Sequence, residues 1–319
     1  MSHSRIAGTG SALPARRVTN AELAEDLATS DEWVVSRTGI RTRHIAGEGE
    51  STCSLATSAA RAALASADVG AKEIGMIVLA TTTPDMLFPS TASLVQAQLG
   101  IRDAAVFDVQ AVCAGFVYAL AVADRFVAAG MCHHALVIGA DVFSRLIDWR
   151  DRRTAVLFGD GAGAVVLSAA DGPGLMSAHL HSDARQTSIL KVDGRVERGR
   201  VQGRPFVEMK GGEVFRFAVR ALADNAREAL RHNRMSVEEL DWYIPHQANV
   251  RIIDAVGARL GLGGARVVKT VADHGNTSAA SVPLALDVAA RDGRLRPGQS
   301  VLLQGVGSGM TWGAVLLRW

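Results

Sequence analysis

Three residues of the sequence have side chains that could together carry out chemistry on a thioester: Cys113, His246 and Asn276. A cysteine can attack a thioester and hold the acyl group covalently. An imidazole and a side-chain amide can donate hydrogen bonds to the negative charge that develops on a carbonyl oxygen. Such a set needs no metal, and the chain shows no His and Cys spacing typical of a metal site. The residue types therefore indicate acyl transfer through a cysteine.

Each of the three residues also has an ordinary structural interpretation. Cys113 lies at a predicted strand-to-helix turn, where the helix dipole lowers a thiol pKa, but a buried cysteine can be purely structural. His246 follows a predicted strand, at the edge where α/β enzymes place catalytic groups. Asn276 precedes a run of small residues and is also a typical helix N-cap. Only the combination of the three favours catalysis.

The other cysteines and one further histidine are predicted to have structural roles. Cys53 lies in the first turn of a predicted helix and is expected to pack in the core. Cys132 is followed by two histidines, but side chains from adjacent residues cannot converge on one metal ion. We expect His274 to lie at the surface or to cap a helix. No metal site is predicted.

The glycine-rich segment 158–163 raises the possibility of a nucleotide site, because it contains glycines at alternate positions. A dinucleotide fingerprint follows a strand and opens a helix. Here the glycines precede a predicted strand at 164–167, so the sequence context argues against a nucleotide-dependent oxidoreductase. We interpret the glycines as positions of close backbone approach.

Short apolar runs alternate with alanine-rich helical patterns, which predicts an α/β fold. The predicted strands are 77–80, 105–109, 135–139, 164–167, 242–244 and 301–303. The predicted helices are 55–67, 91–99, 114–129, 214–232 and 250–260. Ser51 is the expected N-cap of the first helix, and Gly130 is expected just beyond the end of the third.

The order of these features is repeated in the two halves of the chain. Cys113 and Asn276 each begin a helix, and each helix is followed by a strand that ends in glycine, at Gly139 and Gly305. A glycine-rich segment that runs into Gly-Ala-Val comes next in both halves. We therefore predict a duplicated unit with halves 1–172 and 173–319, divided at the turn of residues 171–174.

Composition narrows the class of protein. The 319 residues are 48% hydrophobic with a net charge of +2, so the chain can bury a large core and lacks the basic excess of a nucleic-acid binder. Three cysteines are too few and odd in number for a disulfide framework. We see no signal peptide and no apolar run long enough to span a membrane. These features predict a soluble cytoplasmic protein.

Several motifs, spread over nearly the whole chain and in the expected order, resemble those of the β-ketoacyl-acyl-carrier-protein synthase III family. These are the initiating condensing enzymes of fatty acid synthesis, in the thiolase-like superfamily. The matching segments are 29–41, 113–116, 158–163, 245–249, 274–283 and 311–313. The resemblance implies a thiolase-like duplicated αβαβα layered fold with two mixed sheets, and a homodimer.

The resemblance also implies a role for each catalytic candidate. Cys113 would be acylated by a short acyl-CoA primer, and the backbone N–H groups of Cys113 and Ser308 would form the oxyanion hole. His246 and Asn276 would bind the thioester carbonyl of malonyl-acyl-carrier protein and stabilise the enolate left by loss of CO2. No cofactor is implied, because coenzyme A takes part only as the substrate thioester.

Binding residues follow from the same resemblance. Trp33 would stack on the adenine of coenzyme A, and Arg37 and Arg152 would contact the adenine and phosphates. The residues that would line the pantetheine path are Gly211, Phe215 and Asn249. The residues that would contact the acidic carrier protein are Arg216, Arg251 and Arg259. Segment 191–220, with eight Lys and Arg against four Asp and Glu, adds local positive charge. Without the resemblance, these residues are ordinary surface or half-buried side chains.

The sequence departs from the family pattern around the acyl pocket. Ser308 interrupts a stretch that is often three glycines, and Val306 and Met310 stand where phenylalanine is frequent. Phe88 matches the gate of the acyl pocket, which is supplied across the dimer. These differences leave the identity of the primer open.

Two other functions remain as alternatives. A relative with the same three residues could make a specialised metabolite or transfer a different acyl group. A non-catalytic protein that binds coenzyme A or a carrier would be expected to have lost one of Cys113, His246 and Asn276, and all three are present.

Overall fold

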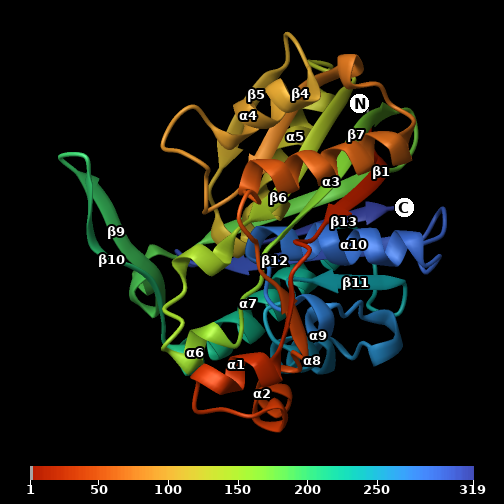
Figure 1. Cartoon of the computed structure of the whole chain (residues 1–319). Coiled ribbons are helices and arrows are strands. Elements are labelled where there is room, and N and C mark those ends of the chain that lie inside the picture. The colour runs from red at the N-terminus through yellow and green to blue at the C-terminus, as the bar shows by residue number, and fades with distance from the viewer. Residues whose placement is uncertain (1–2) are drawn as a thin grey trace.

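The computed structural model describes residues 3–319, so the first two residues of the predicted N-terminal half lie outside it. Five layers alternate between helices and sheets (Figure 1). Helices α3 (Thr52–Ala67) and α4 (Thr91–Leu99) cover one sheet, and α7 (Gly211–His232) covers the other. Helices α5 (Gly115–Ala128) and α10 (Ser281–Arg291) lie between the sheets. The predicted αβαβα fold with two mixed sheets is confirmed.

The first sheet comes entirely from the N-terminal part of the chain. Its order is β1-β7-β6-β4-β5, with β1–β7 and β7–β6 antiparallel and the remaining pairs parallel. In that order the strands are His3–Ala12, Gly161–Ala170, His134–Asp141, Ile74–Ala80 and Ala105–Val109. The central strands are buried on both faces, which explains their continuous apolar sequences.

The second sheet has the same arrangement and comes from the C-terminal part. Its order is β8-β13-β12-β11, again with two antiparallel pairs followed by a parallel one. In that order the strands are Leu175–Ser182, Thr311–Arg318, Ser300–Gly307 and Trp242–Pro245. Beyond β11, a single parallel bridge between Tyr243 and Val267 stands where the first sheet has β5. The matching strand order supports the predicted duplication, whose boundary near residue 172 stays a prediction.

The residues predicted to begin one helix and to follow another lie where the sequence placed them. Ser51 caps α3 by accepting from the Ser54 N–H, and Gly130 beyond α5 has the positive φ of 73° that glycine tolerates best. Every predicted helix and strand is present, although most extend a few residues beyond the predicted ends.

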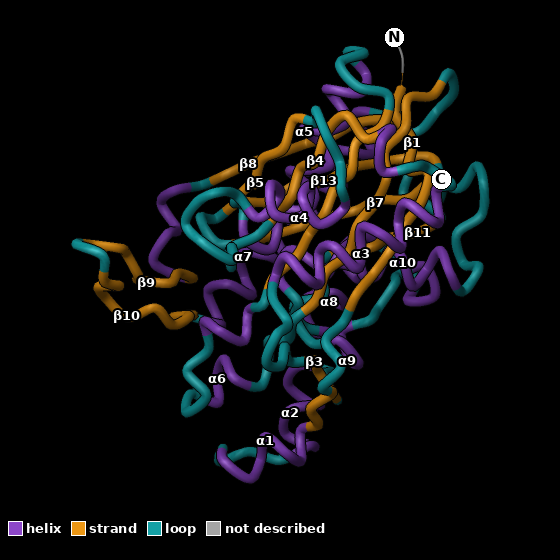
Figure 2. The backbone as a smooth tube through the Cα atoms, turned by 45° about the horizontal axis from the view of Figure 1, so that its top comes forward, coloured by secondary structure: helices purple, strands orange, loops and turns teal. Residues whose placement is uncertain are grey.

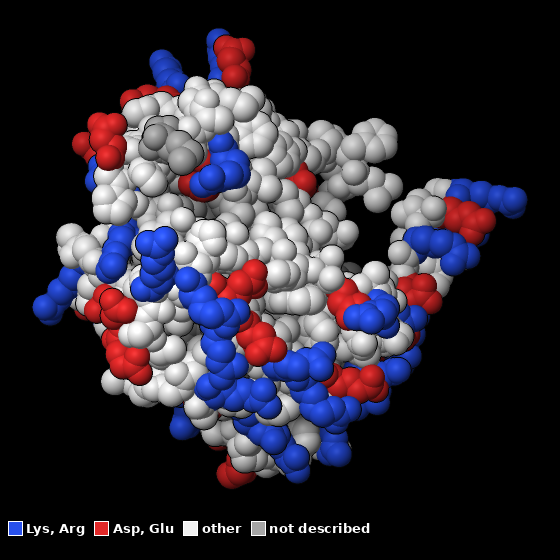
Figure 3. All heavy atoms as spheres, turned by 180° about the vertical axis from the view of Figure 1, so that it is seen from behind, with Lys and Arg blue, Asp and Glu red and all other residues white. Residues whose placement is uncertain are grey.

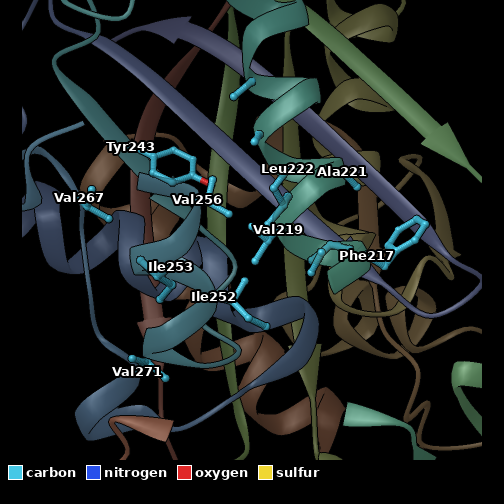
Figure 4. Packing of buried hydrophobic residues seen from close by; sticks show 14 of the residues in the cluster. Phe217, Val219, Ala221, Leu222, Tyr243, Ile252, Ile253, Val256, Val267 and Val271 are labelled. Atoms are coloured by element: carbon cyan, nitrogen blue, oxygen red, sulfur yellow. The ribbon is translucent and has the colours of Figure 1, made fainter. Parts of the chain in front are cut away.

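Apolar side chains of α7, α8 (Val250–Leu260) and β11 form one of the cores. Val219 and Leu222 from α7 face Ile252 and Val256 from α8, with Tyr243 beside them (Figure 4). This packing fixes α7 and α8 against the second sheet. It also fixes the ends of these helices, which carry several of the candidate binding residues.

A two-stranded hairpin was not predicted. Strands β9 (Leu190–Glu197) and β10 (Arg200–Met209) pair antiparallel and project from the body, away from both sheets (Figure 2). On one face of the hairpin, Leu190, Val192 and Val196 of β9 lie beside Val201 and Val207 of β10. The other face carries charged side chains, so apolar and charged residues alternate along β9. This alternation was visible in the sequence, but the density of arginines concealed it.

A smaller unit near the N-terminus sits beside the entrance to the site. It contains the short pair β2 (Arg17–Thr19) and β3 (Thr42–His44) with α1 (Asn20–Asp26) and α2 (Asp31–Thr38). The buried Arg43 guanidinium donates to Asn20 Oδ1 at 2.8 Å and to the Val156 carbonyl at 2.9 Å. Arg43 thereby ties this unit to the body.

Candidate active site

Cys113 lies at the centre of the molecule, in the turn η2 (Val112–Ala114) between β5 and α5. Val112 has a φ of 48°, a conformation that is costly for a β-branched residue and that is held by the surrounding packing. Strand β12 presses on this turn, since a Cβ on Gly307 would lie 2.8 Å from the Cys113 nitrogen. The second sheet therefore fixes the position of the cysteine.

Burial sets the chemistry of the resting thiol. Cys113 is only 5% exposed, and its Sγ lies 3.5 Å from Ser278 Oγ. Burial raises the pKa of Cys113 to about 12, and the hydrogen bond to Ser278 offsets only part of that rise. The position at a helix N-terminus predicts a lowered pKa, whereas burial of Cys113 raises it.

His246 follows β11 and is held at two points. Its backbone N–H donates to the Gln304 carbonyl at 2.8 Å, and its Nδ1 lies 2.6 Å from Ser281 Oγ. His246 is 3% exposed, and burial lowers the pKa of its imidazole to about 3. The imidazole is therefore neutral at physiological pH and can donate one hydrogen bond.

Asn276 is held by the glycine-rich segment. Its N–H donates to the Leu157 carbonyl at 2.9 Å, and its carbonyl accepts from the Gly159 N–H at 3.0 Å. A Cβ on Gly159 would lie 2.6 Å from the His274 carbonyl oxygen, so this glycine permits close backbone approach, as predicted. The Asn276 Oδ1 accepts from the Ser278 N–H at 3.0 Å. Its amide N–H2 has no partner within residues 3–319 and can donate to a ligand.

A single cavity of about 1170 Å³ brings most of the predicted site together. Cys113, His246 and Asn276 all line it, although they come from three distant parts of the chain. The predicted binding residues that also line it are Trp33, Arg37, Gly211, Phe215, Arg216, Asn249, Arg251, Val306 and Ser308. Met310 lines it as well. The cavity can hold a ligand larger than a short acyl group.

Trp33 forms a cluster with two arginines, Arg37 and Arg152, beside the cavity. The guanidinium carbons of Arg152 and Arg37 lie 5.2 Å and 6.0 Å from the Trp33 ring centroid. Asn249 caps α8 by accepting from the Arg251 N–H, and its Nδ2 donates to the Arg37 carbonyl at 3.1 Å. An aromatic ring with two adjacent cations is suited to a flat, phosphorylated ligand.

Three predicted site residues lie outside the cavity wall. Arg152 contacts Trp33 from α6 (Arg152–Ala155), and Arg259 is exposed at the end of α8. Phe88 is 84% exposed, with Leu87 at 74%, in the loop between β4 and α4. In a single chain Phe88 therefore does not close the acyl pocket.

The structure also shows the surroundings of Cys53, Cys132 and His274. All three cysteines are free, as predicted, and Cys53 and Cys132 pack against apolar clusters. His274 is neither fully exposed nor a helix cap. Its Nδ1 is buried without a hydrogen-bond partner in the described part of the chain, which corrects the prediction. Residues 3–319 contain no group of three His, Cys, Asp or Glu side chains placed to hold a metal ion.

Sequence reasoning did not assign the residues that hold the catalytic candidates in place. Ser278 and Ser281 lie within the motif at 274–283, but only Asn276 and His274 were given roles. The buried Asp141 accepts from the hydroxyls of three threonines and from the Ala279 N–H, which anchors the turn beside Cys113. The spacing within the motif gave no sign of these contacts.

Two segments of the chain match family descriptions. Residues 107–184 match 3-Oxoacyl-[acyl-carrier-protein (ACP)] synthase III, and residues 230–319 match its C-terminal part. A curated relative from Bordetella petrii, a beta-ketoacyl-[acyl-carrier-protein] synthase III, is 58% identical over 100% of this chain and 98% of its own. A relative of the same name from Neisseria gonorrhoeae is 53% identical over 100% of both chains.

The chain belongs to the 3-oxoacyl-[acyl-carrier-protein] synthase III family. It is an enzyme, an acyltransferase of the condensing type that initiates fatty acid synthesis. The synthase III structure from Aquifex aeolicus has a TM-score of 0.95 at 42% identity, covering 99% of this chain and 100% of that one. The priming beta-ketosynthase of the R1128 polyketide pathway has a TM-score of 0.95 at 37% identity, covering 99% and 96%.

No helix in residues 3–319 is both long and apolar enough to cross a membrane. The predicted cytoplasmic location and the predicted lack of a cofactor stay predictions.

Proposed function

We propose that this synthase condenses a short acyl-CoA with malonyl-acyl-carrier protein through an acyl-Cys113 intermediate. The observation that carries the proposal is the convergence of Cys113, His246 and Asn276 on one cavity. The chain supplies a nucleophile and two neutral donors there. The proposed reaction requires these groups and uses no cofactor.

In the first step Cys113 Sγ attacks the acyl-CoA carbonyl. The backbone N–H groups of Cys113 and Ser308 stabilise the tetrahedral oxyanion, and coenzyme A leaves as a thiol that carries away the cysteine proton. Because the pKa of Cys113 is raised to about 12, this step involves losing a tightly held proton. Acylation then leaves a neutral thioester in a buried site that disfavours charge.

In the second step the malonyl thioester carbonyl accepts hydrogen bonds from His246 and Asn276. Breaking of the bond to the carboxylate releases CO2 and leaves its electron pair on an enolate, whose oxygen the two donors stabilise. The enolate carbon attacks the acyl carbonyl on Cys113, the cysteine thiolate is expelled and takes up one proton from water, and a β-ketoacyl-carrier product forms. A neutral imidazole performs this task without a change of charge.

Coenzyme A is proposed to enter beside Trp33. The adenine would stack on the Trp33 ring, where the Arg152 guanidinium is already placed, and Arg37 would contact phosphate. Gly211, Phe215 and Asn249 line the cavity between this cluster and the catalytic residues, which supports their assignment to the pantetheine path.

The acidic carrier protein is proposed to dock on the basic residues around the cavity. Lys and Arg gather over the lower half of the face in Figure 3, whereas the projecting hairpin β9–β10 carries side chains of both charges. Arg216, Arg251 and Arg259 are exposed and make no ion pair within residues 3–319. We expect Arg259→Glu, at an exposed residue outside the cavity wall, to slow condensation with malonyl-carrier about 3- to 10-fold at low salt while acylation by acyl-CoA is unchanged. Steady-state rates with the matched surface change Arg61→Glu check this; equal losses for both variants would contradict it.

A homodimer is proposed to complete the acyl pocket. Met86, Leu87 and Phe88 form an exposed apolar loop, with exposed fractions of 46%, 74% and 84%. Isolated soluble chains rarely leave such side chains in water. Insertion of this loop into the partner's cavity would bury Phe88 and close the acyl pocket.

The primer is proposed to be a short acyl-CoA, with a different acyl group as the alternative. Val306 and Met310 line the cavity, and valine leaves more room there than phenylalanine. A specialised pathway is the alternative setting, as for the R1128 priming ketosynthase, which shares the fold at 37% identity.

An acyl-CoA panel tests the proposed function. The purified protein is exposed to acetyl-CoA and to longer, branched and aromatic acyl-CoAs, and intact-protein mass spectrometry detects the adduct. We expect one acyl group per chain, mapped to Cys113 by peptide analysis, followed by its loss on addition of malonyl-carrier protein. An unmodified protein after the whole panel would contradict the proposal.

A further inference from the structure

We propose that Ser281 is a positioning residue, which holds the His246 imidazole in the tautomer with its proton on Nε2. This inference rests on the proposed function, in which His246 donates a hydrogen bond to the malonyl thioester. A neutral imidazole has one N–H and one lone pair, and only the tautomer with Nε2–H can donate from that nitrogen.

The hydrogen bonds around Ser281 determine where its proton lies. Ser281 Oγ is 2.6 Å from His246 Nδ1 and also accepts from the Gln247 N–H at 3.3 Å. A backbone N–H can only donate, so the contact with Gln247 uses a lone pair of the hydroxyl. Within residues 3–319, His246 Nδ1 is the one acceptor within reach of the Ser281 hydroxyl proton. Ser281 is 1% exposed, so a proton without an acceptor would be costly, and the hydroxyl therefore donates to Nδ1.

The other ring nitrogen then carries the proton. His246 lines the cavity, and its Nε2 has no hydrogen-bond partner in the described part of the chain. Burial lowers the pKa of His246 to about 3, so the ring does not take a second proton at physiological pH. The result is a single N–H donor available to the cavity.

The fold keeps this arrangement rigid. Ser281 is the first residue of α10, and the His246 backbone is fixed by its bond to the Gln304 carbonyl. Without the Ser281 hydroxyl, Nδ1 would lose its buried donor, and the tautomer with Nδ1–H would become populated. That form presents a lone pair to the developing enolate and repels it.

The first test uses the wild-type protein. Nitrogen NMR of histidine-labelled protein reports which ring nitrogen is protonated, and comparison with His246→Gln identifies the His246 signals. We expect Nε2–H in the wild type. A wild type with Nδ1–H overturns the proposal, and this result does not depend on whether any variant folds.

The second test compares variants after acylation by acetyl-CoA. We expect Ser281→Ala to acylate within about twofold of the wild type, to condense at least about 10-fold more slowly, and to show the Nδ1–H tautomer. Ser281→Cys, which keeps a weak donor, should recover part of the rate. The control is Ser168→Ala, because Ser168 Oγ lies 2.7 Å from His134 Nδ1 away from the cavity, and it should condense normally.

The outcomes separate this inference from the function on which it rests. Wild-type condensation together with full activity and an unchanged tautomer in Ser281→Ala overturns the role of Ser281 alone. A wild type that forms no acyl-enzyme overturns the proposed function, while the NMR measurement still reports the tautomer.

Discussion

The molecule contains two turns of the same kind, and only one of them carries a reactive atom. Turn η2 leads into α5, and turn η6 (Ser278–Ala280) leads into α10. Each contains a non-glycine residue with positive φ, Val112 at 48° and Ser278 at 50°. The two turns meet where the Cys113 thiol forms a hydrogen bond with Ser278 Oγ. The repeated turn thus places both halves of the chain at the same point.

Each turn is also packed against a glycine of the opposite half. A Cβ on Gly305 of β12 would lie 2.7 Å from the Ala114 Cα in the first turn. A Cβ on Gly139 of β6 would lie 2.3 Å from the Ala279 carbonyl oxygen in the second. The difference between the turns lies in chemistry: the first contains the nucleophile, whereas the second is flanked by the donor Asn276 and by Ser281, the serine that orients His246. This comparison predicts that acylation and condensation can be separated by mutation.

The largest effect is expected for the nucleophile turn. Cys113→Ala should form no acyl-enzyme, and condensation should fall by about 10³-fold or more, because the covalent route is lost. Intact-protein mass spectrometry after exposure to acetyl-CoA measures this. Cys53→Ala is the matched control and should acylate normally; an adduct on the Cys113→Ala protein would place the nucleophile elsewhere.

Changes among the donors should affect the second step. His246→Ala and Asn276→Ala should still acylate, but condensation should fall by about 10²- to 10³-fold, since each loses one hydrogen bond to the enolate. Single-turnover rates for the two steps give both numbers. If either variant lost acylation and condensation equally, the division between the two turns would be wrong.

Substitution of Gly139 and Gly305 tests whether both turns depend in the same way on close packing against the opposite half of the chain. Gly139→Ala and Gly305→Ala should each lower the free energy of unfolding by about 1–3 kcal/mol, because a methyl group would overlap backbone atoms. Gly305→Ala should mainly slow acylation and Gly139→Ala mainly condensation. Urea unfolding checks stability against Gly172→Ala, where a Cβ meets nothing within 4 Å. Destabilisation equal to that of this control would contradict the packing argument.

The two steps should also differ in their dependence on pH. Because burial raises the pKa of Cys113 to about 12, the thiolate fraction and hence acylation should rise with pH, up to about tenfold per unit, between pH 6 and 9. Because the pKa of His246 is lowered to about 3, condensation by the acylated enzyme should be flat over the same range. Stopped-flow rates for each step measure the two profiles. A condensation rate that falls below pH 7 would show that His246 takes up a proton there.

The fold class could be predicted from the alternation of apolar strands and helical patterns, and the three catalytic candidates from their combination and from the motifs that contain them. The motif at 274–283 identified Asn276 but not the roles of Ser278 and Ser281. Those roles depend on contacts that Cys113 and His246 make with Ser278 and Ser281, more than 30 residues away from either in sequence. The raised thiol pKa was also missed, since helix position is readable from the sequence and the depth of burial is not.

The most direct test of the account follows one acyl group through a single turnover. The wild type is acylated with ¹³C-acetyl-CoA, freed of coenzyme A, and mixed with malonyl-carrier protein, and both the Cys113 peptide and the product are measured by mass spectrometry after rapid quenching. The account predicts that label leaves Cys113 at the rate at which it enters the β-ketoacyl product, and that it stays on Cys113 in His246→Ala. Labelled product formed while the label on Cys113 remains unchanged would contradict it.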